Sequence, residues 1–345
     1  MTEITLQDQM EKIRGFEKGY RAAQVLNQGA SLFLMQTLGG AGEGMTVSDL
    51  SMRLMLYEPF VRIWCQTAYH FDILDCGESG RFSLQPFLAE VLGMDSGLDR
   101  GLPDVFGPHL MGEGEGGDQN LMNYFRTGQP VRAGKTAAES RATQEATKGV
   151  SVIFFSMILP KYQELKRLMD KGIKFLDVGC GSGYFIAELA SAFKDSKFVG
   201  IDPDIHGLTR AEEAVMQFGL DEQISIEDMA AEEIPFEDEF DMISMVATLH
   251  EIPPEVREEA VRRVYRALKK EGFLLILDFP YPGSIQDFRN PRYDFGIIEQ
   301  YFEAPQGILH LNADQQNELL TGAGFKDIQR TDVGDGTFDF ILTRK

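Results

Sequence analysis

Phe175-Leu-Asp-Val-Gly-Cys-Gly-Ser-Gly183 indicates the fold of this chain more strongly than any other segment. An apolar run, residues 173–178, is short enough for a buried parallel strand, and it passes directly into glycines at three alternate positions. The residues that follow have an apolar pattern typical of a helix. Glycine suits the turn between them because the backbone must bend sharply and approach a ligand without an intervening Cβ. We therefore expect a strand, a tight ligand-binding turn and a helix.

A second apolar run, residues 197–201, ends in Asp202, about 20 residues after the glycines. In open α/β sheets an acid at this place holds the hydroxyls of a ribose. The glycine spacing is G-x-G-x-G, whereas dinucleotide sites have G-x-G-x-x-G, and position 184 is Tyr. The two runs together predict a nucleoside-binding half of a sheet. A domain that binds NAD, or no ligand, is the alternative.

Residues 177–183 and Val199-Gly-Ile-Asp202, at this separation, resemble the cofactor motifs of class I S-adenosylmethionine-dependent methyltransferases. The resemblance implies an α/β fold with a Rossmann-like, seven-stranded, mostly parallel sheet and a C-terminal antiparallel hairpin. The pattern predicts that hairpin over residues 327–343, turned by Gly334-Asp-Gly336. The resemblance also implies S-adenosylmethionine as the cofactor and S-adenosylhomocysteine as the product. We assign residues 166–345 to this domain.

The same resemblance assigns cofactor contacts to residues that follow successive strands of the domain. Asp177 is implied near the cofactor ammonium, and Asp202 is implied to accept from the ribose hydroxyls. Asp228 is implied to accept from the adenine amine, and Met229 to pack on the ring. Counting back from Pro235-Phe236 places Ala230 at the adenine instead. The full expected set is Asp177, Gly179, Cys180, Gly181, Gly183, Asp202, Pro203, Asp228 and Met229.

The composition limits the partners that the chain can have. Its 345 residues fit one or two domains, and its net charge is −21 at pH 7. Such a chain is repelled by phosphate backbones and by acidic membrane surfaces, so we expect neither nucleic acid nor a membrane as a partner. Three cysteines without a framework pattern, and no signal peptide or membrane-spanning run, predict a cytoplasmic location. No cluster of cysteine and histidine has metal-site spacing, so no metal is expected.

The N-terminal part, residues 1–100, has the pattern of a small helical domain. Two helices are expected from Thr46 and from Glu58, followed by a hairpin over residues 71–84. This order is winged-helix-like, and it resembles the N-terminal domain through which small-molecule O-methyltransferases dimerise. DNA binding is the alternative, but the second helix carries only Arg62 as a strong base. We therefore expect a homodimer.

Residues 101–165 are expected to be a loop followed by linker helices that line a pocket. The glycine-rich loop over 101–120, with His109 and Met111, is either a lid or a solvated loop. The helix just before the cofactor domain lines the substrate pocket in the O-methyltransferase family. The resemblance therefore implies a substrate pocket formed by Phe154, Phe155, Met157, Tyr162 and, from a later strand, Asp278. For the helix residues, an interdomain core is the alternative.

His250 is the candidate catalytic base. It lies just past a predicted strand over residues 240–246, where open parallel sheets place their ligands. A neutral hydroxyl is a poor nucleophile, and a histidine with a pKa near 6.5 is suited to remove its proton. The position resembles the base of plant-type O-methyltransferases, where His-Asp-Trp-Ser follows this strand. Here His250-Glu251-Ile252-Pro253 stands instead, which leaves the role of His250 open.

The prediction is a methyltransferase that acts on a small molecule, with O-methylation of a hydroxylated aromatic compound as the expected reaction. Transfer to nitrogen, sulfur or carbon on the same fold is one alternative, because a nucleophile without a proton to lose needs no base. A regulatory protein that binds S-adenosylmethionine without catalysis is the other, since the glycine and acid motifs serve binding alone.

Overall fold

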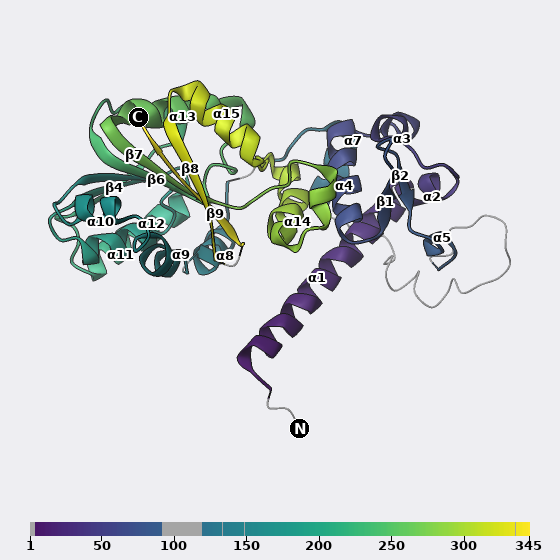
Figure 1. The fold of residues 1–345 in the computed structure, drawn as a ribbon, viewed down its shortest axis with the longest axis horizontal. Coiled ribbons are helices and arrows are strands. Elements are labelled where there is room, and N and C mark those ends of the chain that lie inside the picture. Colours follow the sequence, from purple (N-terminus) through teal and green to yellow (C-terminus); the bar gives the residue numbers. More distant parts are fainter. Residues whose placement is uncertain (1–3, 92–118, 133, 148, 335) are drawn as a thin grey trace. The chain divides into compact units, whose positions relative to one another are not determined.

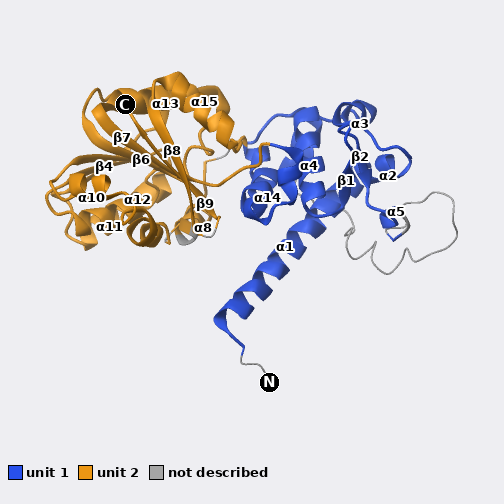
Figure 2. Ribbon diagram, in the orientation of Figure 1, with its two compact units in different colours: residues 1–131, 284–306 blue, residues 132–283, 307–345 orange. Residues whose placement is uncertain are grey.

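The structure is a computed structural model that describes residues 4–91, 119–132, 134–147, 149–334 and 336–345. His109, Met111 and the predicted loop up to residue 118 lie outside these residues. The chain forms two compact units, shown in Figure 2: residues 1–131 with 284–306, and residues 132–283 with 307–345. The predicted division at residues 100 and 165 stays a prediction.

The second unit is built on one seven-stranded sheet (Figure 1). The strand order is β5-β4-β3-β6-β7-β9-β8, and the first five of these pair in parallel. β9 is antiparallel to both of its neighbours, so the predicted C-terminal hairpin and the fold class are confirmed. The strands are β3 (Lys174–Val178), β4 (Lys197–Asp202), β5 (Ile224–Asp228), β6 (Phe240–Val246), β7 (Leu268–Asp278), β8 (Lys326–Val333) and β9 (Phe338–Arg344).

The parallel strands are apolar because both faces of the sheet are covered. Neighbouring residues of β3 lie in different cores: Phe175 belongs to the core on one face and Leu176 to the core on the other. The first core is closed by α11 (Tyr184–Ala192), α12 (Ile205–Gln217) and the helical segments from α9 to α10. The second is closed by α13 (Pro254–Ala267) and α15 (Ala313–Ala323), which Figure 1 shows on the other side of the sheet.

The helices before β3 are α8 (Ala137–Thr147), α9 (Val150–Ile153) and α10 (Gln163–Met169). Between α9 and α10 the chain winds as a π-helix over Phe154–Ile158. This widened turn precedes Pro160, and the next helix begins only at Gln163, because proline disrupts the interior of a helix.

The first unit holds the two helices and the hairpin that the N-terminal pattern predicts. Its core is aromatic, with Phe60, Trp64, Phe125 and Tyr301 fully buried. Gly29 is required beside Trp64, because a Cβ there would lie 2.3 Å from the indole ring. No described helix is long and apolar enough to cross a membrane. The described helices and strands of this unit are α1 (Leu6–Ser31), α2 (Leu34–Gly39), α3 (Val47–Leu54), α4 (Glu58–His70), β1 (Leu74–Cys76), β2 (Phe82–Leu84), α5 (Leu88–Val91), α7 (Gln119–Thr127) and α14 (Asp294–Glu303). It also has 3₁₀ turns at Ile285–Arg289, Pro291–Tyr293 and Ala304–Gln306. The second unit has a 3₁₀ turn at Ala231–Glu233.

Candidate functional site

The glycine turn between β3 and α11 has a backbone that only glycine adopts easily. Gly179, Gly181 and Gly183 have φ values of +74°, +53° and +68°. A Cβ at Gly179 would lie 2.4 Å from Thr248 Oγ1, so the turn packs directly on the loop after β6. A Cβ at Gly181 would meet no described atom within 4 Å, so the backbone there borders open space. The turn therefore has the positive φ angles and the open side expected of a ligand-binding loop.

Asp202 at the end of β4 ties this strand to the glycine turn. Its Oδ2 accepts from the Gly181 N–H at 2.8 Å, and its Oδ1 accepts from the Asp204 N–H at 2.7 Å. Burial raises the pKa of Asp202 above its usual value, although these two hydrogen bonds oppose the rise. Each carboxylate oxygen has a second lone pair, so Asp202 keeps the capacity to accept from a ligand hydroxyl.

Asp177 in β3 is buried beneath the turn, with 2% of its surface exposed. The Ser244 hydroxyl in β6 donates to its Oδ1 at 2.5 Å. Burial raises the pKa of Asp177 to about 7, and the Asp202 carboxylate adds to the rise. A cation bound nearby would favour the ionised form, so this carboxyl suits a site for an ammonium group.

Cys180 and Pro203, also expected at the cofactor, lie differently from the acids. The Cys180 side chain belongs to the first core, the one closed by α11 and α12. A Cβ at Gly200 would lie 2.9 Å from its sulfur. Burial raises the pKa of its thiol, so it is an inert core group. Pro203 is exposed beside Asp202. Any cofactor contact of Cys180 would therefore use its backbone.

Asp228 ends β5 beside Asp202, its register partner on β4. The carboxyl of Asp228 is exposed, and Met229 is half buried, with its N–H donating to the Asp202 carbonyl at 3.3 Å. The structure thus brings the predicted adenine and ribose residues to neighbouring strand ends. The contacts assigned to them stay predictions.

His250 and Asp278 form a buried pair at the carboxyl ends of β6 and β7. The His250 Nδ1–H donates to Asp278 Oδ1 at 2.5 Å, and the Phe279 N–H donates to the same oxygen at 2.9 Å. Burial raises the pKa of Asp278, but the His250 and His310 rings and the hydrogen bonds outweigh it, so the net pKa is lowered. An ionised Asp278 carboxylate can only accept a hydrogen bond, so the neutral His250 ring must carry its proton on Nδ1. The lone pair that can take up a proton is then on Nε2.

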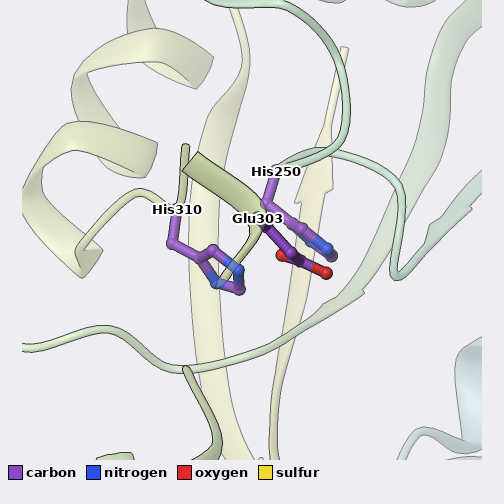
Figure 3. Close-up of side chains that lie close together, drawn as sticks. All are labelled: His250, Glu303 and His310. Carbon is purple, nitrogen blue, oxygen red and sulfur yellow. The ribbon is translucent and has the colours of Figure 1, made fainter. Parts of the chain in front are cut away.

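Two further groups fix the position of His250. The His310 ring stacks on the His250 ring, with centroids 4.5 Å apart and planes inclined by 25° (Figure 3). The buried Arg257 guanidinium donates to the His250 carbonyl at 2.8 Å and to the Leu309 carbonyl at 2.9 Å. The backbone reaches this place through Ala247, whose φ of +50° is unusual for a residue with a Cβ. The imidazole is therefore held on several sides.

The predicted substrate residues before β3 are only partly brought to this end of the sheet. Phe154 is buried and lines a small cavity with Ser244 and Val246, close to the ends of the strands. Phe155 and Met157 are half buried, Phe155 stacking on Phe193 with centroids 6.3 Å apart. Tyr162 points to the hairpin instead, where its hydroxyl lies 2.7 Å from Thr331 Oγ1. Their contacts with a substrate stay predictions.

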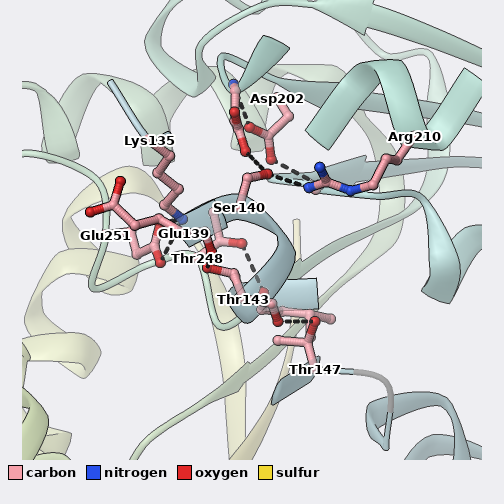
Figure 4. A network of polar contacts seen from close by, with 12 residues as sticks. Lys135, Glu139, Ser140, Thr143, Thr147, Asp202, Arg210, Thr248 and Glu251 are labelled. Carbon is pink, nitrogen blue, oxygen red and sulfur yellow. Dashed lines mark hydrogen bonds and ion pairs between the residues drawn. The ribbon is translucent and has the colours of Figure 1, made fainter. Parts of the chain in front are cut away.

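A polar network around α8, shown in Figure 4, was not predicted from the sequence. Lys135 donates to both oxygens of Glu251, at 2.9 and 3.2 Å. Ser140 donates to Asp204 Oδ2 and accepts from the Arg210 guanidinium. The segment with Lys135 has no periodic pattern and no motif, so no signal in the sequence could have placed it beside the glycine turn.

Comparisons with known proteins agree with this geometry. Residues 175–272 match the family described as "Methyltransferase domain". The second unit has the class I S-adenosylmethionine-dependent methyltransferase fold, and the matched residues in it are its methyltransferase domain. Its cofactor is S-adenosylmethionine, as the resemblance to this family implied. The dinucleotide alternative is therefore wrong.

The relatives cover different shares of the methyltransferase chain. An uncharacterized protein of Haemophilus influenzae is 34% identical over 112 residues, which are 32% of this chain and 44% of the relative. A carboxy-S-adenosyl-L-methionine synthase of Nautilia profundicola is 26% identical over 218 residues, covering 54% of this chain and 88% of the relative. The chain thus spans less than half of the first of these relatives.

One solved structure extends the likeness to nearly the whole methyltransferase. An O-methyltransferase family 2 protein from Planctomyces limnophilus, solved in complex with apigenin, has a TM-score of 0.71 at 17% identity. The alignment covers 97% of this chain and 95% of that protein. At this identity the likeness concerns the fold, which includes a helical N-terminal region and the seven-stranded sheet.

Proposed function

We propose that this methyltransferase transfers the methyl group of S-adenosylmethionine to a hydroxyl group of a small aromatic molecule, with His250 as the general base. The observation that carries the proposal is the His250–Asp278 pair at the carboxyl ends of β6 and β7. A buried carboxylate that orients an imidazole and stabilises its protonated form is what proton removal from a hydroxyl requires.

The residues present fit the cofactor. The open side of Gly181 allows close approach, Asp202 retains acceptor capacity, and Asp177 suits an ammonium group. When bound, S-adenosylmethionine supplies a sulfonium methyl group open to in-line displacement. The glycine turn would hold the cofactor, and alignment of methyl group and nucleophile would supply much of the rate enhancement.

The acceptor side supports a hydroxylated, apolar compound. Apolar side chains, Phe154, Ile158, Leu277 and Phe340, lie near the strand ends around a gap with room for about one water molecule. Asp278 Oδ2 is buried without a hydrogen-bond donor among the residues that the structure describes, so it can accept one more hydrogen bond. His250 Nε2 would take the hydroxyl proton and pass it to solvent after transfer. Apigenin, the hydroxylated aromatic compound bound by the Planctomyces protein, is a reasonable first acceptor to test.

The substitution His250→Ala tests the base. We expect turnover to fall by about 10²- to 10⁴-fold, the usual contribution of general base catalysis, while the Kd for S-adenosylmethionine stays the same. His206→Ala is the matched control, because His206 is exposed at the start of α12. Unchanged turnover of the His250 variant would remove the base, and favour transfer to a nitrogen, sulfur or carbon atom that has no proton to lose.

The proposed assembly is a homodimer formed through the first unit. The first turns of α1 present a stripe of apolar side chains that are at least 41% exposed: Leu6, Met10, Ile13, Phe16 and Tyr20. Their spacing of three and four residues places them on one side of the helix. A face this apolar is typical of an interface between protein chains, and a second copy of the chain is the partner that we propose.

A further inference from the structure

Lys135 is connected to the glycine turn by a short series of contacts. Its ammonium donates to Glu251 at 2.9 Å, and the Glu251 N–H donates to the Thr248 carbonyl at 3.0 Å. The Thr248 side chain in turn lies against Gly179, within 2.4 Å of where a Cβ would be. Three successive contacts thus connect the ammonium to the first glycine of the turn, and Figure 4 labels the first three residues of this series, Lys135, Glu251 and Thr248.

The charges around Lys135 show which other groups it faces. Burial lowers its pKa, but Glu251, Asp202 and Asp204 outweigh this, so the net pKa is raised and the side chain stays charged. Burial raises the pKa of Asp202, whose Oδ2 accepts from the Gly181 N–H, and the Lys135 charge opposes that rise. The ammonium therefore lies within electrostatic reach of both the β4 end and the β6 loop.

The cofactor presents two charges to this part of the site. Its methionine end carries an α-ammonium and an α-carboxylate. The acids here, Asp177, Asp202 and Glu251, attract the ammonium and repel the carboxylate. A half-buried carboxylate is costly unless a cation pairs with it, and a lysine that already binds one carboxylate has donors for a second.

We propose that Lys135 binds the α-carboxylate of the methionine part of S-adenosylmethionine, bridging it to Glu251. The inference rests on the cofactor assignment, but it is independent of the acceptor and of His250. Lys135 lies outside the matched methyltransferase domain, residues 175–272, and outside every motif in the sequence. It would make the segment before α8 a part of the cofactor site.

Decarboxylated S-adenosylmethionine isolates the proposed contact, because it keeps the sulfonium and the amine and lacks only the carboxylate. We would measure the Kd of both compounds by titration calorimetry for the wild-type chain and for Lys135→Met. The variant should bind S-adenosylmethionine about 10- to 100-fold more weakly, the range for a lost hydrogen bond to a charged group. Its affinity for the decarboxylated compound should not fall, because that compound has no carboxylate to lose a partner.

Two further variants separate the contact from a general effect on folding. Lys135→Arg keeps the charge and should retain most of the preference for the carboxylated compound. Lys166→Met is the control, since Lys166 pairs only with Asp170 on the surface of α10 among its described contacts. Equal losses for both compounds in Lys135→Met, or no loss for either, would overturn the inference. Failure of the proposed O-methylation would instead leave all of these affinities as they are.

Discussion

Asp278→Asn separates two effects of Asp278: orientation of the His250 ring, and electrostatic stabilisation of the His250 imidazolium. Asparagine has the size of aspartate and can still accept from the His250 Nδ1–H, so the ring should keep its place. What the variant loses is the negative charge 2.5 Å from Nδ1, measured between Nδ1 and Oδ1. That charge would stabilise the imidazolium that forms as the acceptor loses its proton.

The size of the effect follows from the separation of the two charges. With charge centres about 4 Å apart and an effective dielectric constant of about 20, the attraction is about 4 kcal/mol. Because each 1.4 kcal/mol, roughly, is tenfold in rate, complete loss would lower kcat by about 10³-fold. We expect a fall of about 10²- to 10³-fold at neutral pH, with part of the rate recovered as the pH approaches the phenol pKa near 10.

The assay is initial-rate methyl transfer to a phenolic acceptor as a function of pH, with the Kd for S-adenosylmethionine measured in parallel. Asp339→Asn is the matched control, because Asp339 is also buried, lies opposite Asp278 on β9 and binds Arg330 at 3.1 Å. Wild-type kcat in Asp278→Asn would refute the reasoning, and so would an equal fall in the control.

The two variants must also be compared for stability. The folded-state pKa of Asp278 is below its usual 3.8, so the ionised carboxylate stabilises the fold above that pH. This contribution is lost as the pH falls through the lowered pKa. Thermal unfolding at neutral pH should therefore show a modest loss in Asp278→Asn, which is to be separated from the change in kcat.

Three other predictions concern the cofactor turn, the fold and the assembly. The pKa of Asp177 is raised from 3.8 to about 7, because the folded protein favours the neutral carboxyl. The resulting contribution to folding stability is complete below pH 3.8 and is lost as the pH rises through about 7. Asp177→Asn should thus raise the Tm of the cofactor-free protein at pH 8 and weaken S-adenosylmethionine binding; a lower Tm with unchanged affinity would contradict this. Gly179→Ala should lower the Tm much more than Gly219→Ala, because both have positive φ but only a Cβ at Gly179 clashes, with Thr248. If calorimetry shows equal decreases in Tm for the two variants, the positive φ alone accounts for the loss and the predicted clash with Thr248 is contradicted. Ile13→Glu should convert dimers to monomers in sedimentation experiments, whereas Gly15→Glu, half a turn away on α1, should not; a dimer in both variants would exclude the α1 stripe as the interface.

The sheet and the glycine turn could be predicted because they depend on local pattern. Short apolar runs ending in glycine or an acid define parallel strands whose carboxyl ends meet, and the observed β3 and β4 follow that pattern. The same rule placed His250 and Asp278 at one edge of the sheet. It could not show that the two bond, because side-chain pairing depends on register and on the backbone turn at Ala247.

The remaining parts of the site come from segments without periodicity. His310 precedes α15 in an irregular stretch, yet its ring lies on that of His250. Lys135 comes before a helix that no motif marks, yet it binds Glu251. Such contacts are fixed by how loops pack on the finished sheet, and the sequence of a loop carries little information about its partner.

O-methylation by this chain can be tested by transfer of an isotopically labelled methyl group from S-adenosylmethionine to a panel of phenols, with the product examined by NMR. We expect a labelled methyl group on oxygen for the wild-type chain, and almost none for His250→Ala despite unchanged cofactor binding. A labelled methyl group on carbon or nitrogen, or equal O-methylation by the His250 variant, would contradict it.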